Sequence, residues 1–141
     1  MEDYRLIYPL FAMFLLTLST LARLFRARSK LVAQGEIEMG FFRTYQGGSE
    51  PDDSAKIARH FVNLYEAPVL FYTVCLAALA TGITGTPFLV LAWVYVGLRT
   101  VHTIIHTGAN KLMPRVYAYF SSWIALTALW LLLVYRVVSV A

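Results

Sequence analysis

Four stretches of the sequence are predominantly apolar over the length of a membrane-spanning helix, and polar segments separate them. A helix needs about 20 largely apolar residues to cross the hydrocarbon core of a bilayer. Three uninterrupted runs, residues 6–22, 67–86 and 116–135, contain no charged residue, whereas the stretch that begins at Pro87 is interrupted by Arg99, His102 and His106. We therefore predict an all-α membrane protein, one domain with four transmembrane helices over about residues 6–24, 56–82, 87–107 and 115–138.

The longest polar segment, about residues 25–55, is predicted to be a loop because turn-forming residues gather between Gly47 and Pro51. Bases near the predicted helix ends accumulate around this loop and in the last connection: Arg23, Arg26, Arg28, Lys30, Arg43, Lys56, Lys111 and Arg115. Only Arg5 and Arg136 flank the termini. Since Lys and Arg favour the cytoplasmic side, both connections are predicted to be cytoplasmic and both termini non-cytoplasmic. This topology is an antiparallel four-helix bundle.

The composition agrees with a membrane protein, because 59% of the residues are hydrophobic and 14% are charged. Soluble domains are about half apolar and a quarter charged, so most water-soluble enzymes are excluded. The net charge of +4 comes from bases that flank apolar runs, which argues against a nucleic-acid partner. Glu2 and Asp3 precede the first stretch, which is therefore not typical of a cleavable signal. Cys75 is the single cysteine, so no intrachain disulfide forms, and we expect it to be buried.

Two groups of polar side chains interrupt the predicted second and third helices at spacings of three or four residues, so each group shares one helical face. The groups are Lys56, Arg59, Asn63 and Glu66, and Arg99, His102 and His106. A charged group near the bilayer centre costs roughly 2.5 to 3.5 kcal/mol, which makes both groups functional candidates. The structural alternatives are a snorkelling anchor for Lys56 and an ion pair between Glu66 and Arg99 that joins two helices.

His102 and His106, four residues apart on one helix, form half of a potential metal or haem site. Zinc normally takes three or four protein ligands. The third histidine, His60, is next to Arg59, and Cys75 is expected several turns deeper in the membrane. We therefore expect no metal and assign the histidines to hydrogen bonds between helices. The sequence contains no Ser-His-Asp, dinucleotide-binding or P-loop pattern.

The basic residues with a single acid suit a small anionic ligand that also carries an amine. Arg59, Arg99 and Arg115 can each pair with a carboxylate, and Glu66 can accept an ammonium group. The tripeptide glutathione has this pattern of charges. Its thiol has a free pKa of about 8.5, so a guanidinium that stabilises the thiolate would increase the nucleophilic fraction at neutral pH.

The motif Lys56-x-x-Arg59-x-x-x-Asn63-x-x-Glu66, followed by Pro68, resembles the second helix of the MAPEG family, the membrane-associated proteins in eicosanoid and glutathione metabolism. Two further features resemble the glutathione transferase and prostaglandin E synthase branch, namely Arg99-x-x-His102-Thr103 and the later Arg115. The stretch from Arg59 to Pro68 is most similar to bacterial members, which implies a multi-pass protein of a bacterial inner membrane.

The resemblance implies a homotrimer of four-helix subunits that bind glutathione between neighbouring subunits near the cytoplasmic side. It implies that Arg115 stabilises the thiolate as the catalytic residue. It also implies that Arg59, Asn63 and Glu66 hold the peptide and that Arg99 supports it. The full glutathione-binding set comprises Arg23, Lys56, Arg59, Asn63, Glu66, Arg99, His106 and Tyr119. Two positions depart from the glutathione-using relatives. Lys56 replaces an arginine, which removes bidentate carboxylate pairing, and His106 replaces a tyrosine.

Three functions remain open from the sequence. The first is a glutathione-dependent transferase or peroxidase that acts on lipophilic electrophiles. The alternative is a non-catalytic MAPEG-type protein that binds lipids or acts as a scaffold. The third is a small proton-coupled transporter that uses Glu66, and it ranks last because Arg59 and Arg99 lie close to that acid, whereas such exporters carry few bases in their helices.

Overall fold

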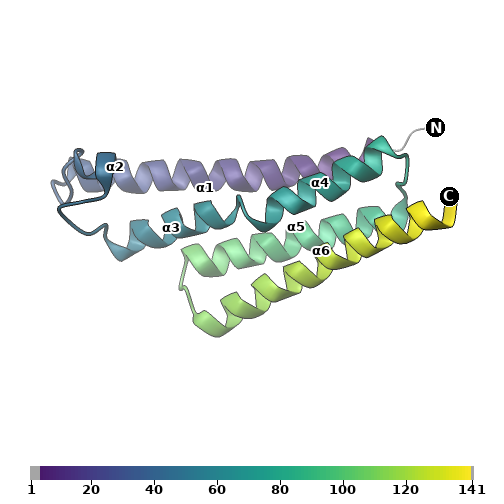
Figure 1. Ribbon diagram of the computed structural model, residues 1–141. Helices are drawn as coiled ribbons and strands as arrows, with labels where there is room; N and C mark the ends of the chain where they lie inside the picture. Colours follow the sequence, from purple (N-terminus) through teal and green to yellow (C-terminus); the bar gives the residue numbers. More distant parts are fainter. Residues whose placement is uncertain (1–3, 141) are drawn as a thin grey trace.

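The structure is a computed structural model that describes residues 4–140 (Figure 1). Its elements in chain order are the 3-10 helix η1 (Tyr4–Leu6) and the α-helices α1 (Ile7–Ala33), α2 (Phe41–Thr44), α3 (Asp52–Asn63), α4 (Ala67–Ala80), α5 (Thr86–Thr107) and α6 (Leu112–Val140). No strand occurs within residues 4–140. The prediction that rests on Glu2 and Asp3 lies outside the described residues.

Four helical stretches are long and apolar enough to cross a membrane: Tyr4–Ala33, Asp52–Ala80, Thr86–Thr107 and Leu112–Ser139. The prediction of an all-α membrane protein with four spanning helices is therefore confirmed. Successive spans run in opposite directions in Figure 1, with α5 packed along α6 and α3 beside both α1 and α5. The first and last described residues lie at one end of the bundle, and the α1–α3 and α5–α6 connections lie at the other.

The first helix is longer than the predicted 6–24, because α1 continues to Ala33 through a run of basic residues. Lys and Arg are good helix formers, and no Gly or Pro occurs between the predicted end at residue 24 and Gly35, which has a φ of 70°. The connection is correspondingly shorter than the predicted loop 25–55, and it includes α2. The next helix begins at Asp52, with Asp52 and Asp53 in the first turn, where acids favour the helix dipole.

The predicted single helix over 56–82 is divided into α3 and α4 by a break at residues 64–66. Pro68, in the first turn of α4, has no N–H to donate, and its ring would clash with the carbonyl of Leu64 in a continuous helix. The break leaves the Asn63 carbonyl with a single backbone hydrogen bond, a long one of 3.4 Å from the Glu66 N–H. That carbonyl is thereby available to another helix.

The apolar core occupies the half of the bundle nearest the chain ends. Its residues come from the first half of α1, from α4, from the first half of α5 and from the second half of α6. Phe71 and Tyr95 stack inside it with ring centroids 4.4 Å apart. Cys75 is fully buried there, as expected. Many large apolar side chains remain exposed on the outer surface, such as Phe11, Ile124 and Leu131, which is the surface that lipid covers in a membrane protein.

An ion pair ties the connection after α1 to the helix itself. Glu50 accepts hydrogen bonds from Arg28 Nε at 2.8 Å and Arg28 Nη2 at 3.1 Å, and it also accepts one from the Ser54 hydroxyl. Partial burial alone would raise the pKa of Glu50, but the hydrogen bonds from Arg28 and Ser54 outweigh that effect and hold the pKa below its ordinary value. The carboxylate is therefore ionised in the fold at neutral pH.

Acid is expected to weaken this tie. Because the pKa of Glu50 is lower in the folded than in the unfolded state, its contribution is complete at neutral pH and is lost as the pH falls through the folded value. We expect the Tm of the wild type in detergent to fall more between about pH 6 and pH 3 than that of Glu50→Gln, which lacks the ionised carboxylate. At neutral pH, Glu50→Gln should lower the free energy of unfolding by roughly 1 kcal/mol. Glu38→Gln, in the exposed part of the same connection, serves as the control, and equal acid sensitivity of the wild type and Glu50→Gln would refute the assignment.

Candidate functional site

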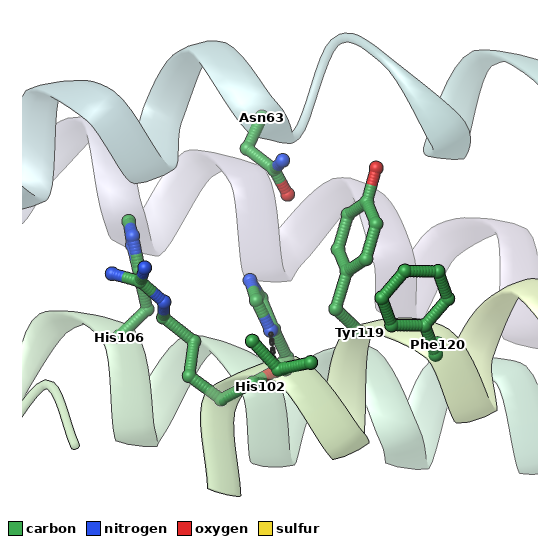
Figure 2. A pocket seen from close by; sticks show the side chains of 7 residues that line it. Asn63, His102, His106, Tyr119 and Phe120 are labelled. Carbon is green, nitrogen blue, oxygen red and sulfur yellow. Dashed lines mark hydrogen bonds between the residues drawn. The ribbon is translucent and has the colours of Figure 1, made fainter. Parts of the chain in front are cut away.

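A pocket of about 220 Å³ lies between the end of α3, the second half of α5 and the start of α6 (Figure 2). Its lining consists of Asn63, His102, His106, Arg115, Val116, Tyr119 and Phe120. Asn63 points from α3 toward the side chains of α5 and α6. The structure thus brings together four of the residues that the sequence indicated, Asn63, His106, Arg115 and Tyr119. The pocket is smaller than most sites for whole ligands, which measure about 300 to 1,000 Å³.

Arg99 is fully buried beside this pocket and is only partly satisfied. Its Nη2 donates to the backbone oxygen and to Oδ1 of Asn63, both at 2.9 Å. Its guanidinium carbon also lies 5.7 Å from the ring centroid of Tyr119. Two further nitrogens, Nε and Nη1, are buried without a hydrogen-bond partner among the described residues. A buried cation with free donors is costly, so this position favours an anionic ligand.

Glu66 is linked to Arg99 only through Asn63. The Nδ2 of Asn63 donates to Glu66 Oε2 at 2.9 Å, while the Oδ1 of the same side chain accepts from Arg99. No direct ion pair joins Glu66 to Arg99 in the described part of the chain. The structural alternative of an ion pair between two helices is therefore wrong for this subunit. Glu66 lies at the break in the second span and is exposed, so its carboxylate remains accessible to an ammonium group.

Arg115 lies in the first turns of α6 and is held from two directions. Its Nη1 donates to Asn110 Oδ1 at 2.7 Å, and its backbone oxygen accepts a hydrogen bond from His102 Nδ1 at 3.1 Å. Asn110, in the connection between α5 and α6, has a φ of 50°, which asparagine tolerates better than most residues. These contacts hold the Arg115 guanidinium at the pocket, on the side of the bundle that the sequence predicts to be cytoplasmic.

Three predicted site residues lie apart from the pocket. Lys56 bonds Asp53 at 2.7 Å and the Gly108 oxygen at 3.2 Å, and so it joins the start of α3 to the end of α5. Arg23 Nη1 donates to Thr107 Oγ1 at 2.9 Å between α1 and α5. Arg59 is exposed and lines a separate hollow with Arg28 and Glu50. Within a single subunit, these bases belong to helix packing and to the surface.

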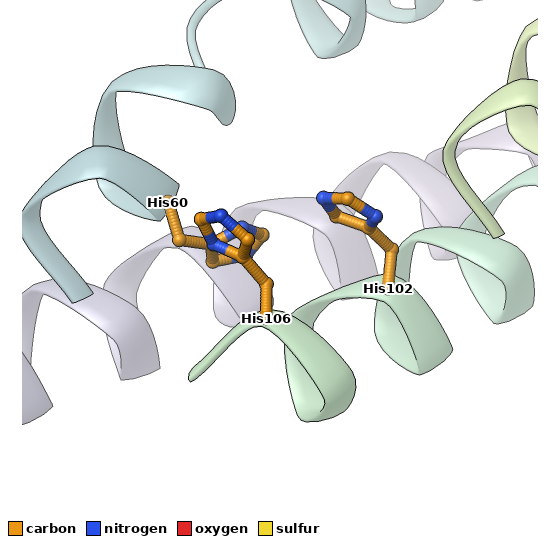
Figure 3. Close-up of side chains that lie close together, drawn as sticks. All are labelled: His60, His102 and His106. Carbon is orange, nitrogen blue, oxygen red and sulfur yellow. The ribbon is translucent and has the colours of Figure 1, made fainter. Parts of the chain in front are cut away.

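The three histidines gather at one place next to the pocket (Figure 3). His60, on α3, has its ring centroid 5.3 Å from that of His102 and 5.0 Å from that of His106, and the two α5 rings are 5.5 Å apart. His60 is fully buried although its neighbour Arg59 is exposed, because adjacent helical residues point in different directions. The sequence analysis separated His60 from the pair, and the structure unites them.

Sequence reasoning also missed Val116, Phe120 and Asn110. The first two are apolar and carry no chemical signal, although Phe120 is one position beyond Tyr119 at the pocket edge. Asn110 could have been found, because an asparagine in a short connection after a helix often adopts a left-handed backbone. Its contact with Arg115 gives it a positioning role.

The family model described as the MAPEG family matches residues 6–135 of the chain. No curated protein and no solved structure gives a match. The matched range contains the second and third spans completely and all but the outer ends of the first and fourth. It also contains every residue of the pocket and of the histidine cluster.

Proposed function

The chain belongs to the MAPEG family, and on that premise we propose that it is a glutathione-dependent transferase or peroxidase in the membrane that acts on lipophilic electrophiles. The family supports a membrane function related to glutathione or eicosanoids in general, and its members generally use glutathione. The specific activity is inferred from the residues of the site.

The buried and incompletely bonded Arg99 carries this proposal. Its two unpartnered nitrogens lie in the same cluster as the amide of Asn63 and the carboxylate of Glu66. Glutathione has two carboxylates and one ammonium group. Charge-assisted hydrogen bonds from Arg99 to a carboxylate, together with an ammonium bound at Glu66, would match both kinds of charge. An apolar ligand without charges would leave Arg99 unsatisfied.

The chemistry would take place at Arg115. With its guanidinium near the sulfur, the thiol loses its proton more readily, and the thiolate is the reactive nucleophile. In conjugation the thiolate forms a bond to an electrophilic carbon and a halide or similar group leaves. In peroxide reduction two glutathione molecules become the disulfide, while the hydroperoxide becomes an alcohol and water. Phe120 and Val116 supply an apolar wall for the lipophilic partner.

A homotrimer would complete the site. MAPEG proteins are typically trimeric, and in one subunit the pocket is small while Arg59 and Glu66 face outward. A neighbouring subunit placed against α3 would enclose both side chains and enlarge the pocket. We further propose that the pocket lies on the cytoplasmic side of a bacterial inner membrane, with both termini on the opposite side.

The test uses the full chain, purified in detergent or in lipid nanodiscs. Glutathione binding is measured by calorimetry, and turnover is measured with an aromatic halide and with a lipid hydroperoxide. Saturable binding together with either activity would support the proposal. Absence of binding at millimolar glutathione would overturn it. If the purified chain did not bind glutathione but retained bound fatty acid or lipid, the non-catalytic lipid-binding alternative would replace the proposed enzyme.

Replacement of Glu66 tests how the ligand amine is bound. Glu66→Gln removes the charge but keeps the size of the side chain and an acceptor for Asn63. We expect the Kd for glutathione to rise about tenfold, in line with roughly 1.5 kcal/mol for a hydrogen bond to a charged group. Glutathione that lacks its α-amino group should bind the wild type and the variant equally. Glu38→Gln, an exposed glutamate away from the pocket, provides the matched control, and an unchanged Kd in Glu66→Gln would rule out this contact.

A further inference from the structure

The chain has three histidines, and all of them lie in one cluster between two spans. One ligand atom from each of His60, His102 and His106 lies within 4.8 Å of the other two. His60 comes from α3, and the other two come from successive turns of α5 (Figure 3). Buried polar groups normally have a hydrogen-bond partner, so the unpaired atoms in this cluster need an explanation.

The hydrogen bonds of His60 determine which of its nitrogens carries a lone pair. The Thr103 hydroxyl donates its only hydrogen to the Arg99 oxygen at 2.8 Å, so it can only accept in its 2.8 Å contact with His60 Nε2. His60 Nε2 therefore carries the proton. Its Nδ1 is then an unprotonated acceptor, and this atom is buried without any partner. A fully buried imidazole with a free lone pair is suited to binding a metal ion.

The same reasoning applies to His102. Its Nδ1 contacts the backbone oxygen of Arg115 at 3.1 Å, and a carbonyl can only accept, so Nδ1 carries the proton and Nε2 has the lone pair. His106 also has a buried Nδ1 without a partner. In metal sites, a ligating histidine almost always donates its other N–H to a carbonyl, carboxylate or water, which fixes the orientation of the ring. His60 and His102 have such partners in Thr103 and Arg115.

We propose that His60, His102 and His106 form a binding site for one Zn²⁺ ion, with a fourth coordination position beside the pocket that His102 and His106 line. Neutral imidazoles suit zinc, and three protein ligands with an open position are typical of catalytic zinc sites. Tetrahedral coordination with Zn–N bonds of about 2.0 Å places ligand nitrogens roughly 3.4 Å apart. The ligand atoms lie within 4.8 Å of one another in the structure, so zinc binding would draw them together by up to about 1.4 Å.

The surrounding charges determine the fourth ligand. Arg99 precedes His102 by one turn, Arg115 lines the same pocket, and Arg23 bonds Thr107 one position after His106. The described part of the chain places no carboxylate in the cluster. Three neutral ligands leave the full double charge on zinc, so these arginines favour an anion at the open position. Hydroxide or a thiolate meets that requirement.

The experiment measures Zn²⁺ binding by the full chain without glutathione, so its outcome is independent of the proposed activity. The protein is purified in detergent, its affinity tag is removed, and it is stripped with a chelator. We expect calorimetry to show one Zn²⁺ ion per chain, and we expect Co²⁺ to give the visible absorption of a tetrahedral site with nitrogen ligands. Absence of saturable binding, or Co²⁺ spectra of an octahedral aqueous ion, would overturn the proposal.

Three variants locate the site. His106→Gln alters the least buried ligand, and Thr103→Val removes the hydroxyl that orients His60 while keeping the side-chain volume. Loss of an orienting partner lowers metal affinity about 10- to 100-fold. We therefore expect Thr103→Val to lower the affinity for Zn²⁺ by this factor and His106→Gln to lower it by more. Cys75→Ser, which changes the only cysteine, is the control and should bind as the wild type does. Undiminished affinity in folded His106→Gln would assign any bound zinc to another place and refute this site.

Discussion

Replacing Arg115 by alanine is expected to lower kcat for glutathione conjugation by about 100- to 1000-fold, as when an oxyanion-stabilising donor is removed from an enzyme. The expected change in the Kd for glutathione is less than about tenfold, because the carboxylates and amine of the ligand would be bound by other residues. Arg115 is fixed by the 2.7 Å bond to Asn110 and lines the pocket. Its charge would therefore act on the sulfur and much less on the rest of the peptide.

Two further variants sharpen this experiment. Asn110→Gly removes the partner of Arg115 and still permits the positive φ of that position, so kcat should fall by less than in Arg115→Ala while binding is retained. Arg136→Ala, an exposed arginine near the other end of α6, should change neither quantity. A stopped-flow pH profile of thiolate formation adds an independent readout, and we expect the apparent pKa of bound glutathione to rise in Arg115→Ala. If kcat and binding fall equally in that variant, Arg115 has a structural role only.

Replacing Arg99 by lysine should have the largest effect on glutathione binding. Lysine keeps the charge but is a point donor, and it cannot bond both oxygens of Asn63 and also reach a ligand carboxylate with a planar fork. We expect the Kd for glutathione to rise about 10- to 100-fold, which corresponds to roughly 1.5 to 3 kcal/mol for hydrogen bonds to a charged group. Calorimetry on the purified variant measures this change.

The fold must be checked in the same variant because Arg99 is completely buried. The Tm and the elution volume of Arg99→Lys report whether the bundle and its assembly are intact. Arg26→Lys, on the exposed surface of α1, is the matched control and should leave the Kd unchanged. A folded Arg99→Lys variant that binds glutathione as tightly as the wild type would show that the free nitrogens of Arg99 do not contact the ligand.

The four spans were predictable because hydropathy over a helix length is a local property of the sequence. The family could also be named from the spacing of Arg59, Asn63 and Glu66, and the match over residues 6–135 confirms it. Helix ends were less predictable. The extension of α1 to Ala33 follows from helix-forming basic residues that resemble a polar loop in a hydropathy plot. The break before α4 follows from Pro68 and could have been inferred from that residue alone.

The site was predictable only in part, because its geometry depends on how the helices are rotated against one another. Spacing within one helix correctly placed Arg99 and His102 on a common face, but nothing in the sequence gives the orientation of α3 relative to α5. His60 therefore could not be assigned to the other histidines, and Lys56 and Arg59 could not be separated from Asn63. The homotrimer, the membrane orientation and the use of glutathione remain predictions.

The interruption at residues 64–66 divides the second span into two segments with different mechanical roles. Between Asn63 and Ala67 the α-helical hydrogen bonds give way to i→i−3 bonds, of which the one from Glu66 is 3.4 Å long, so α3 and α4 need not tilt as one rod. One segment, α4, is anchored by Phe71 and Val74 in the apolar core. The other segment, α3, carries His60 and Asn63, packs on α1, and is hydrogen-bonded to α5 through His60 and Asn63. A tilt of α3 would thus change the width of the pocket while the lipid-embedded core keeps its packing.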